Sequence, residues 1–146
     1  MLKTLIAVVL ALAALAACAP MSPAPGYAPP AVQAAAGKAV IYVVRTRPDI
    51  SYLTAPIMID DQQLGATFAG TYMRLEVAPG THRLSGTGSD QGSITLNVSA
   101  DRVYFVQHSV SGSWRATSPM SFFTLLDDAR GRAALARAPQ RAGIGT

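Results

Sequence analysis

Apolar and polar positions divide the chain into an amino-terminal apolar run, a proline-rich stretch and a region of short alternating segments. The first run, Leu5 to Ala17, holds thirteen apolar residues in succession and follows Lys3. A helix that crosses a bilayer needs about 20 such residues, whereas a basic start, a shorter apolar run and small residues at its end are typical of an export signal. The pattern predicts that residues 1–17 are a cleaved signal peptide.

The next stretch, residues 18–37, has no apolar period and holds five of the ten prolines. Such a composition cannot bury a core and favours extended, polyproline-like conformations. At ~3 Å per residue the segment could span at most about 60 Å. We therefore interpret it as a Pro/Ala-rich tether.

Short segments with the spacing of β-strands follow from Lys38 onward. Residues 39–44 are apolar on both alternate faces, as expected of a central strand covered on two sides. Residues 71–77 alternate cleanly, as a half-buried strand does. The turn at Pro79-Gly80 needs positive φ at Gly80 and is expected to fold residues 82–85 back beside that strand. Further strands are expected at 57–59, 64–68, 94–98 and 103–110.

This spacing predicts an all-β fold, an antiparallel β-sandwich of about seven strands over residues 38–126. A short helix over 127–138 is expected to begin at Asp127 or Asp128 and to be weakened by Gly131. Pro139 ends it, and residues 139–146 are predicted to be a disordered tail. The chain would then hold one small domain with room for a single core.

The end of the signal carries the most specific motif in the sequence. Leu15-Ala16-Ala17-Cys18 resembles the bacterial lipobox, in which the cysteine is acylated and the peptide is cut just before it. A plain secretory signal, which also ends in small residues, is the alternative. The resemblance implies lipid on Cys18, and Ala19 in place of Asp implies sorting to the outer membrane, facing the periplasm. Because Cys18 is the chain's one cysteine, no thiol remains for a disulfide or a nucleophile.

The domain itself resembles a known group. The matching segments are similar to small bacterial lipoprotein domains of unknown function, and the hairpin with its Pro-Gly-x-His segment resembles PEGA-type β-domains. The resemblance implies the fold and no particular activity. The segments are Gly37 to Val43, Ile59-Asp60, Leu64-Gly65, Gly70 to Met73, Val77 to His82 and Val103 to Val106.

Residues able to do chemistry are few. His82 and His108 lie on different predicted strands with no third ligand at a recognisable spacing, so packed or hydrogen-bonded histidines are expected rather than a metal site. Neither the Asp60-Asp61 nor the Asp127-Asp128 pair can act together on one scissile bond, because neighbouring side chains in an extended chain point to opposite faces. We expect a non-catalytic protein without metal or cofactor.

Two features suit binding. Trp114, Phe122 and Phe123 could present an aromatic patch with Met120 on a loop or edge strand, or could complete the core. Four arginines could contact an anionic envelope polymer or lipid, or could simply form a solvated helix face; they are Arg130, Arg132, Arg137 and Arg141.

These features favour an envelope structural or interaction module, held on the membrane through Cys18. A glycan or small-ligand module and a subunit of a secretion or envelope assembly are the alternatives. Envelope proteins or cell-wall glycan are the expected partners, and nucleic acid is not expected outside the cytoplasm.

Overall fold

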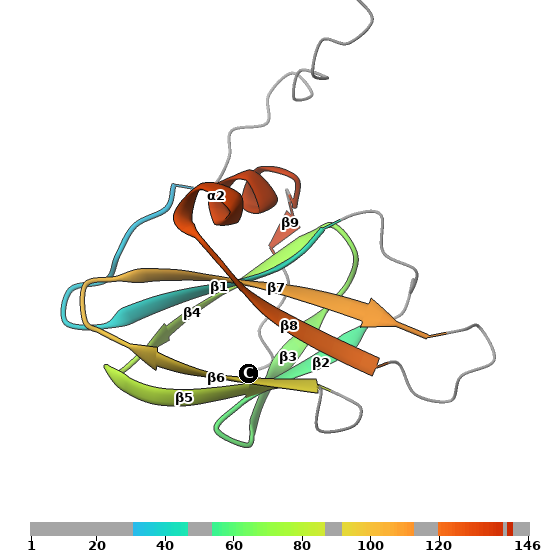
Figure 1. Ribbon diagram of the computed structural model, residues 1–146, viewed down its shortest axis with the longest axis horizontal. Helices are drawn as coiled ribbons and strands as arrows, with labels where there is room; N and C mark the ends of the chain where they lie inside the picture. The colour runs from blue at the N-terminus through green and yellow to red at the C-terminus, as the bar shows by residue number, and fades with distance from the viewer. Residues whose placement is uncertain (1–30, 47–53, 87–91, 113–119, 139, 142–146) are drawn as a thin grey trace, which may run out of the picture.

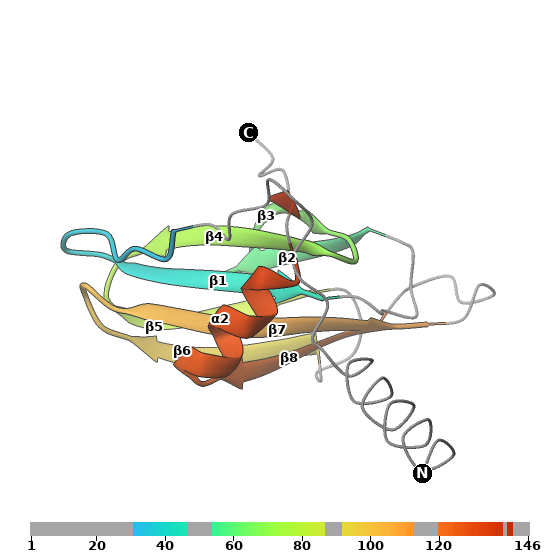
Figure 2. The same cartoon turned by 90° about the horizontal axis from the view of Figure 1, so that it is seen from above.

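The computed structural model describes residues 31–46, 54–86, 92–112, 120–138 and 140–141. Within them the chain forms two β-sheets packed face to face, and a short helix lies on the outer face of one sheet (Figure 1). This confirms the predicted β-sandwich with a short carboxy-terminal helix. Seen from above, the helix crosses the strands of the sheet beneath it (Figure 2).

The first sheet has five strands in the order β8-β7-β1-β4-β9. The second has four, in the order β3-β2-β5-β6. Most pairs are antiparallel, as expected, but β1 runs parallel to β7, and β4 runs parallel to β9. In chain order the strands are β1 (Ala39–Arg45), β2 (Ala55–Ile59), β3 (Gln62–Thr67), β4 (Thr71–Val77), β5 (Gly80–Ser85), β6 (Ser93–Val98), β7 (Val103–Ser111), β8 (Met120–Leu126) and β9 (Gln140–Arg141).

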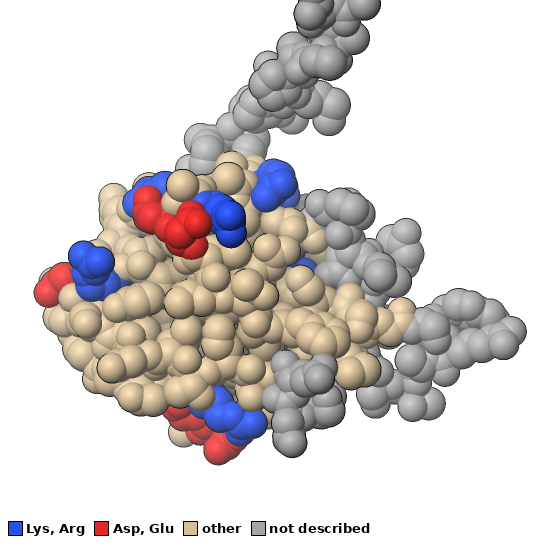
Figure 3. Space-filling model, viewed as in Figure 1, with Lys and Arg blue, Asp and Glu red and all other residues tan. Residues whose placement is uncertain are grey.

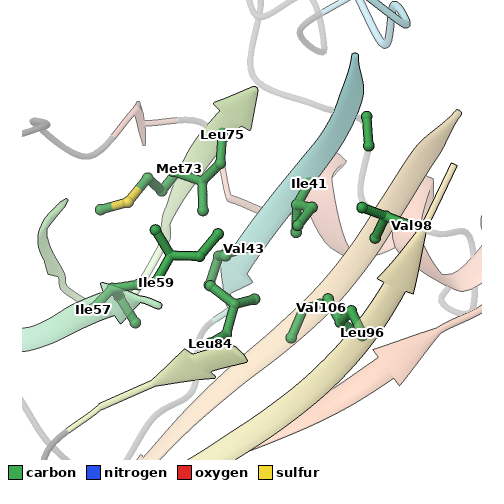
Figure 4. Packing of buried hydrophobic residues seen from close by; sticks show 11 residues of the cluster. Ile41, Val43, Ile57, Ile59, Met73, Leu75, Leu84, Leu96, Val98 and Val106 are labelled. Carbon is green, nitrogen blue, oxygen red and sulfur yellow. The ribbon is translucent and has the colours of Figure 1, made fainter. Parts of the chain in front are cut away.

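The central strand β1 is buried along its whole length. Ile41 and Val43 point between the sheets, where they meet side chains from both sheets (Figure 4). Val40 and Tyr42 point to the opposite face and pack beneath the helix. Two covered faces explain why this segment is apolar at nearly every position.

The helix α2 (Asp128–Ala136) is fixed at its start by Asp127, whose side chain accepts a hydrogen bond from the Arg130 backbone N–H at 2.8 Å. Leu135 is 1% exposed and packs over the five-stranded sheet. Gly131 allows a close approach, because a Cβ there would lie 2.1 Å from Cγ of Phe105. The glycine that weakens the isolated helix thus permits it to seat on β7.

Residues 31–37, at the end of the predicted tether, lie against the domain. Val32 and Ala35 pack against the apolar cluster beneath α2. Tyr42 Oη donates to the Ala31 carbonyl at 3.3 Å, and the Gly37 N–H donates to Asp101 Oδ1 at 2.9 Å. The described chain therefore enters the domain beside α2.

Two local expectations need correction. Gly80 has the predicted positive φ, at 140°, but β4 and β5 lie in different sheets and form no hairpin. Turn residues set the backbone angle and do not decide which strand becomes the neighbour. In the tail predicted to be disordered, Gln140–Arg141 pair with Thr71 and Tyr72 as β9, because main-chain pairing with an open edge needs no apolar pattern.

Candidate functional site

The interior of the sandwich changes from apolar to polar toward one end. On β1 the inward positions Ile41 and Val43 are followed by Arg45, and on β7 Val106 is followed by His108. Five polar side chains at this end are at most 1% exposed: Arg45, Thr67, Thr71, His108 and Ser121. Buried polar groups at this density require hydrogen-bond partners.

A chain of hydrogen bonds connects four of them. Arg45 Nη1 donates to the Thr67 carbonyl at 3.0 Å. Thr67 Oγ1 lies 2.8 Å from His108 Nδ1, and Ser121 Oγ lies 3.0 Å from His108 Nε2. The chain therefore links β1 and β3 to β7 and β8, so that it ties the two sheets together across the interior.

His108 is also held by an aromatic neighbour. Its ring stacks on Phe123, with centroids 4.8 Å apart and planes 7° apart. The serine–histidine contact has the geometry of a nucleophile and its base. Ser121, however, is 1% exposed, and a Cβ on Gly86 would lie only 2.3 Å from Ser121 Oγ. The serine is packed against backbone, so this arrangement serves to join the sheets.

The second histidine lies at the opposite end of the strands, beside the β2–β3 turn. His82 Nδ1 lies 2.6 Å from Asp60 Oδ2, and His82 Nε2 lies 2.8 Å from the Ala78 carbonyl. Asp60 also accepts from the Arg83 backbone N–H at 2.9 Å. Asp60 and Asp61 both have positive φ, as the two central residues of a tight hairpin do. The cluster ties this hairpin to the segment that crosses between the sheets.

The contacts of His82 shift the acid–base balance of both partners. The hydrogen bond to Asp60 raises the pKa of His82, and the Ala78 carbonyl adds to this. The Arg83 backbone N–H, followed by His82, lowers the pKa of Asp60. Both shifts favour a charged imidazolium–carboxylate pair at neutral pH.

The structure separates the predicted aromatic patch. Phe122 and Phe123 are neighbours on edge strand β8, so their side chains point to opposite faces. Phe123 packs against the core, which confirms for this residue the alternative that these side chains complete the core. Met120 is 39% exposed. Trp114 lies outside the described residues, as does Cys18.

The predicted basic residues are partly neutralised on the helix. Arg130 Nε lies 3.4 Å from Asp127, and Arg132 Nε lies 2.8 Å from Asp128. Arg137 is exposed after the end of α2. Arg141 belongs to β9, so it lies on a different element from the other three.

Sequence reasoning missed the polar chain at the end of the interior. One signal was present, because Arg45 continues the inward series of residues 39, 41 and 43 on a strand read as fully buried. Thr67 and Ser121 gave no signal, since their partner is distant along the chain. Across the described ranges no group of three or more His, Cys, Asp or Glu side chains could hold a metal ion. Nor does any helix in the same ranges have the length and hydropathy that a membrane crossing requires.

Comparison with known proteins identifies a family. A family described as "Protein of unknown function (DUF2846)" matches residues 35–119, more than half of the chain, so the chain belongs to this family. The match spans β1 to β7 and includes Arg45, Thr67, His82 and His108. No curated protein and no solved structure matches the chain.

Proposed function

We propose that the protein is a non-catalytic lipoprotein that acts as a structural or interaction module of the bacterial envelope. The description of its family states no function. In this proposal Cys18 carries lipid, residues 19–30 bridge to the domain, and the domain faces the periplasm from the outer membrane. The likeness of the β2–β3 hairpin and the Pro79-Gly80-Thr81-His82 segment to PEGA-type domains belongs to the same proposal.

The observation that carries the proposal is the sequence Leu15-Ala16-Ala17-Cys18 after an apolar run too short to span a bilayer. The entry of the chain beside α2 supports it, because residues 31–37 are bonded to the domain through Ala31 and Gly37. A pull on the tether would therefore act on the side of α2, and the four-stranded sheet would face away from it (Figure 1).

The engagement of both histidines supports a non-catalytic role. A general base must reach a substrate proton, whereas each ring nitrogen of His82 and His108 lies within 3.0 Å of a protein oxygen. His108 is in addition 1% exposed. The fold uses these side chains to join its own elements.

The surface offered to a partner would be the outer face of the four-stranded sheet. Thr81 pairs with Asn97, and Arg83 pairs with Thr95, so these side chains share one face of β5 and β6. All four are exposed. Hydroxyl, amide and guanidinium groups on this face suit hydrogen bonding to a polar protein or glycan surface.

Membrane fractionation of cells producing the full chain tests the anchor. We expect the parent protein in the membrane fraction, with an intact mass that fits a lipidated chain starting at Cys18. Cys18→Ser should abolish the lipid and either release or block the protein. Several acyl chains bind firmly, at ~0.8 kcal/mol per buried CH₂. An unmodified parent chain in the soluble fraction would overturn this part of the proposal.

Gentle cross-linking followed by purification tests the interaction. We expect a partner, either one defined protein or cell-wall glycan, that is retained by the parent and lost with Thr95→Glu, because a carboxylate would face the contact. Ala133→Glu, at an exposed position on α2, is the matched control and should retain it. Equal retention by both variants would reject this face as the interaction surface.

A further inference from the structure

The edge strands on the two sides of the sandwich differ in how well they are protected from pairing with other chains. On the side of β3 and β4, the pairing of β2 with β3 shifts register between Ile57 and Met58. On the same side β9 covers the start of β4, and β4 carries the ion pair of Arg74 with Glu76. Bulges, covering segments and charges are the devices by which natural proteins protect edges from pairing with other chains.

The opposite side, formed by β8 and β6, carries none of these devices in the described residues. β8 reads Met-Ser-Phe-Phe-Thr-Leu-Leu and β6 reads Ser-Ile-Thr-Leu-Asn-Val, without one charged residue or proline. β8 pairs with β7 along all seven of its residues with no shift of register. It is a long, regular edge strand, and no other described strand pairs with its outer side.

The pictures place both strands on one uncharged surface. β6 and β8 lie on the same side of the sandwich (Figure 2), the side that faces the viewer in Figure 1. Figure 3 shows charged side chains gathered over α2 and at the margins of this view, and a broad uncharged area between them.

Large apolar side chains are exposed on this surface. Leu125 is 52% exposed and Met120 is 39% exposed, although both belong to a regular strand. Phe122, Phe123 and Ile94 are partly buried. Exposed apolar groups along an open edge mark a surface that gains stability when it is covered.

We propose that the free edge of β8 pairs with β8 of a second copy of this chain, antiparallel and about a two-fold axis near Phe123. The five-stranded sheets would then form one continuous sheet, and the β6 strands would approach each other on the same side. This proposal is independent of the lipid anchor.

The charge pattern favours a second copy of this chain as the partner of β8. A two-fold contact brings the same patch of each copy together, so any charged residue near its centre would face its own like charge. β8 and β6 carry none, and a partner with a charged surface would find no complementary charge here. A two-fold axis perpendicular to the sheet also makes the two β8 strands antiparallel, as the proposed pairing requires.

Cross-linking of the purified full chain tests the proposal. Thr124→Cys places a thiol at an exposed position next to the proposed axis. A short bismaleimide can join the two thiols across the ~7–8 Å that separates diagonal positions of an antiparallel pair. The matched control is Gln63→Cys, on edge strand β3 at the other side of the sandwich. The parent chain has Cys18 as its one cysteine, so it gives the baseline of cross-linked dimer for both variants.

We expect the parent to have twice the monomer mass in solution, by light scattering corrected for detergent where detergent is needed. Thr124→Cys should give several-fold more cross-linked dimer than Gln63→Cys or the parent. Thr124→Lys should halve the mass and leave the circular dichroism spectrum unchanged, because a charge on the edge opposes pairing.

Three results would each overturn the proposal. They are a monomeric parent, a Thr124→Lys variant that keeps the dimer mass, and equal cross-linking at positions 63 and 124. Failure to find lipid on Cys18 would leave these measurements untouched, so the two proposals fail separately.

Discussion

Both histidines are held through both ring nitrogens, but their partners differ in kind. His82 faces a carboxylate and a carbonyl, which can only accept, so each nitrogen must carry a hydrogen for both contacts to form. His108 faces two hydroxyls, which can donate or accept. The first site therefore needs the charged ring, whereas the second can satisfy a neutral one.

The His82–Asp60 pair predicts a pH window for stability. The pKa of His82 is raised above its ordinary 6.5, so its contribution is complete below pH 6.5 and is lost as the pH rises through the folded value. The pKa of Asp60 is lowered below its ordinary 3.8, so its contribution is complete above pH 3.8 and is lost as the pH falls through the folded value. The pair contributes fully between these limits.

Urea unfolding of the parent and of His82→Asn at several pH values measures this window. We expect the difference in unfolding free energy to be largest near pH 5 to 6 and to shrink toward pH 9, because the parent then loses its proton. His108 is present in both proteins, so its contribution is common to both and does not enter the difference. A difference that stays constant from pH 5 to pH 9 would show that the imidazolium form contributes nothing.

Gly80 begins β5 with φ of 140°, a conformation that side chains with a Cβ rarely adopt. Nothing lies within 4 Å of a Cβ built there, so a substitution adds backbone strain without a clash. Gly80→Val should lower the unfolding free energy by more than ~1 kcal/mol. Thr81→Val, at the exposed neighbouring position, is the control and should change it by less than ~0.5 kcal/mol. Equal midpoints for the two variants would reject backbone strain at Gly80.

At the level of elements, the sequence predicted most of what periodicity alone can determine. The double-sided apolar pattern of residues 39–44 identified the central strand, and the Asp127-Asp128 pair marked the start of α2, with Asp127 as the cap. β8 was foreseen only as a loop or edge strand, because adjacent Phe122 and Phe123 break the alternation expected of a half-buried strand. Phe123 packs against the core inside the sandwich, whereas Phe122 lies on the outer face of β8 and is partly buried.

Sheet membership and the polar end of the interior depend on contacts between distant residues. Thr67 and His108 are 41 positions apart, and Arg45 and Thr67 are 22 apart. No local propensity encodes such pairs, since they form only when strands of two sheets are stacked. The same reason explains why β5 could not be assigned to the sheet of β2 and β6.

The seating of α2 on β7 makes Gly131 a sensitive position. Alanine is ~1 kcal/mol better than glycine in an isolated helix, but the added Cβ would meet the buried ring of Phe105. Overpacking of this kind typically costs about 1–3 kcal/mol, and an approach of 2.1 Å is far inside contact distance. Gly131→Ala should therefore lower the melting temperature despite its better propensity.

Arg132→Ala is the control for this substitution, because it also introduces alanine into α2 but at an exposed position. It removes an ion pair with Asp128 that is exposed to solvent, and exposed pairs contribute little to stability. Thermal unfolding should place the Gly131→Ala midpoint clearly below that of Arg132→Ala. The reverse order would mean that the helix is not seated on Phe105.

At the scale of the whole molecule, the fold has two apolar layers rather than one. The first lies between the sheets, and the second lies between the five-stranded sheet and α2 with residues 31–36. In the second layer Tyr42 stacks on Phe105, with centroids 5.5 Å apart. Packing of the two sheets therefore buries only one of the two apolar faces of the five-stranded sheet, and α2 with residues 31–36 covers the other.

This arrangement predicts that the stable unit is larger than the β-strands of residues 38–126. A chain of those residues would uncover one face of the central sheet, whose side chains are each at most 1% exposed in the complete fold: Val40, Tyr42, Val44 and Phe105. Each fully buried apolar side chain contributes about 1.5–3 kcal/mol, so even partial uncovering is large beside a total stability of about 5–15 kcal/mol. A chain of residues 31–141 keeps the cover and is the matched comparison.

We expect the 31–141 chain to unfold within a few degrees of the full protein, and the 38–126 chain to melt far lower and to bind a hydrophobic dye. Circular dichroism melts and dye fluorescence measure both properties. The intermediate chains 31–126 and 38–141 divide the effect between α2 and residues 31–37. The loss of α2 should account for most of it, because Ala134, Leu135 and Ala138 are each at most 1% exposed, whereas Val32 and Ala35 are only partly buried. A 38–126 chain as stable as the 31–141 chain would show that the outer layer adds nothing and that the sandwich folds on its inner core alone.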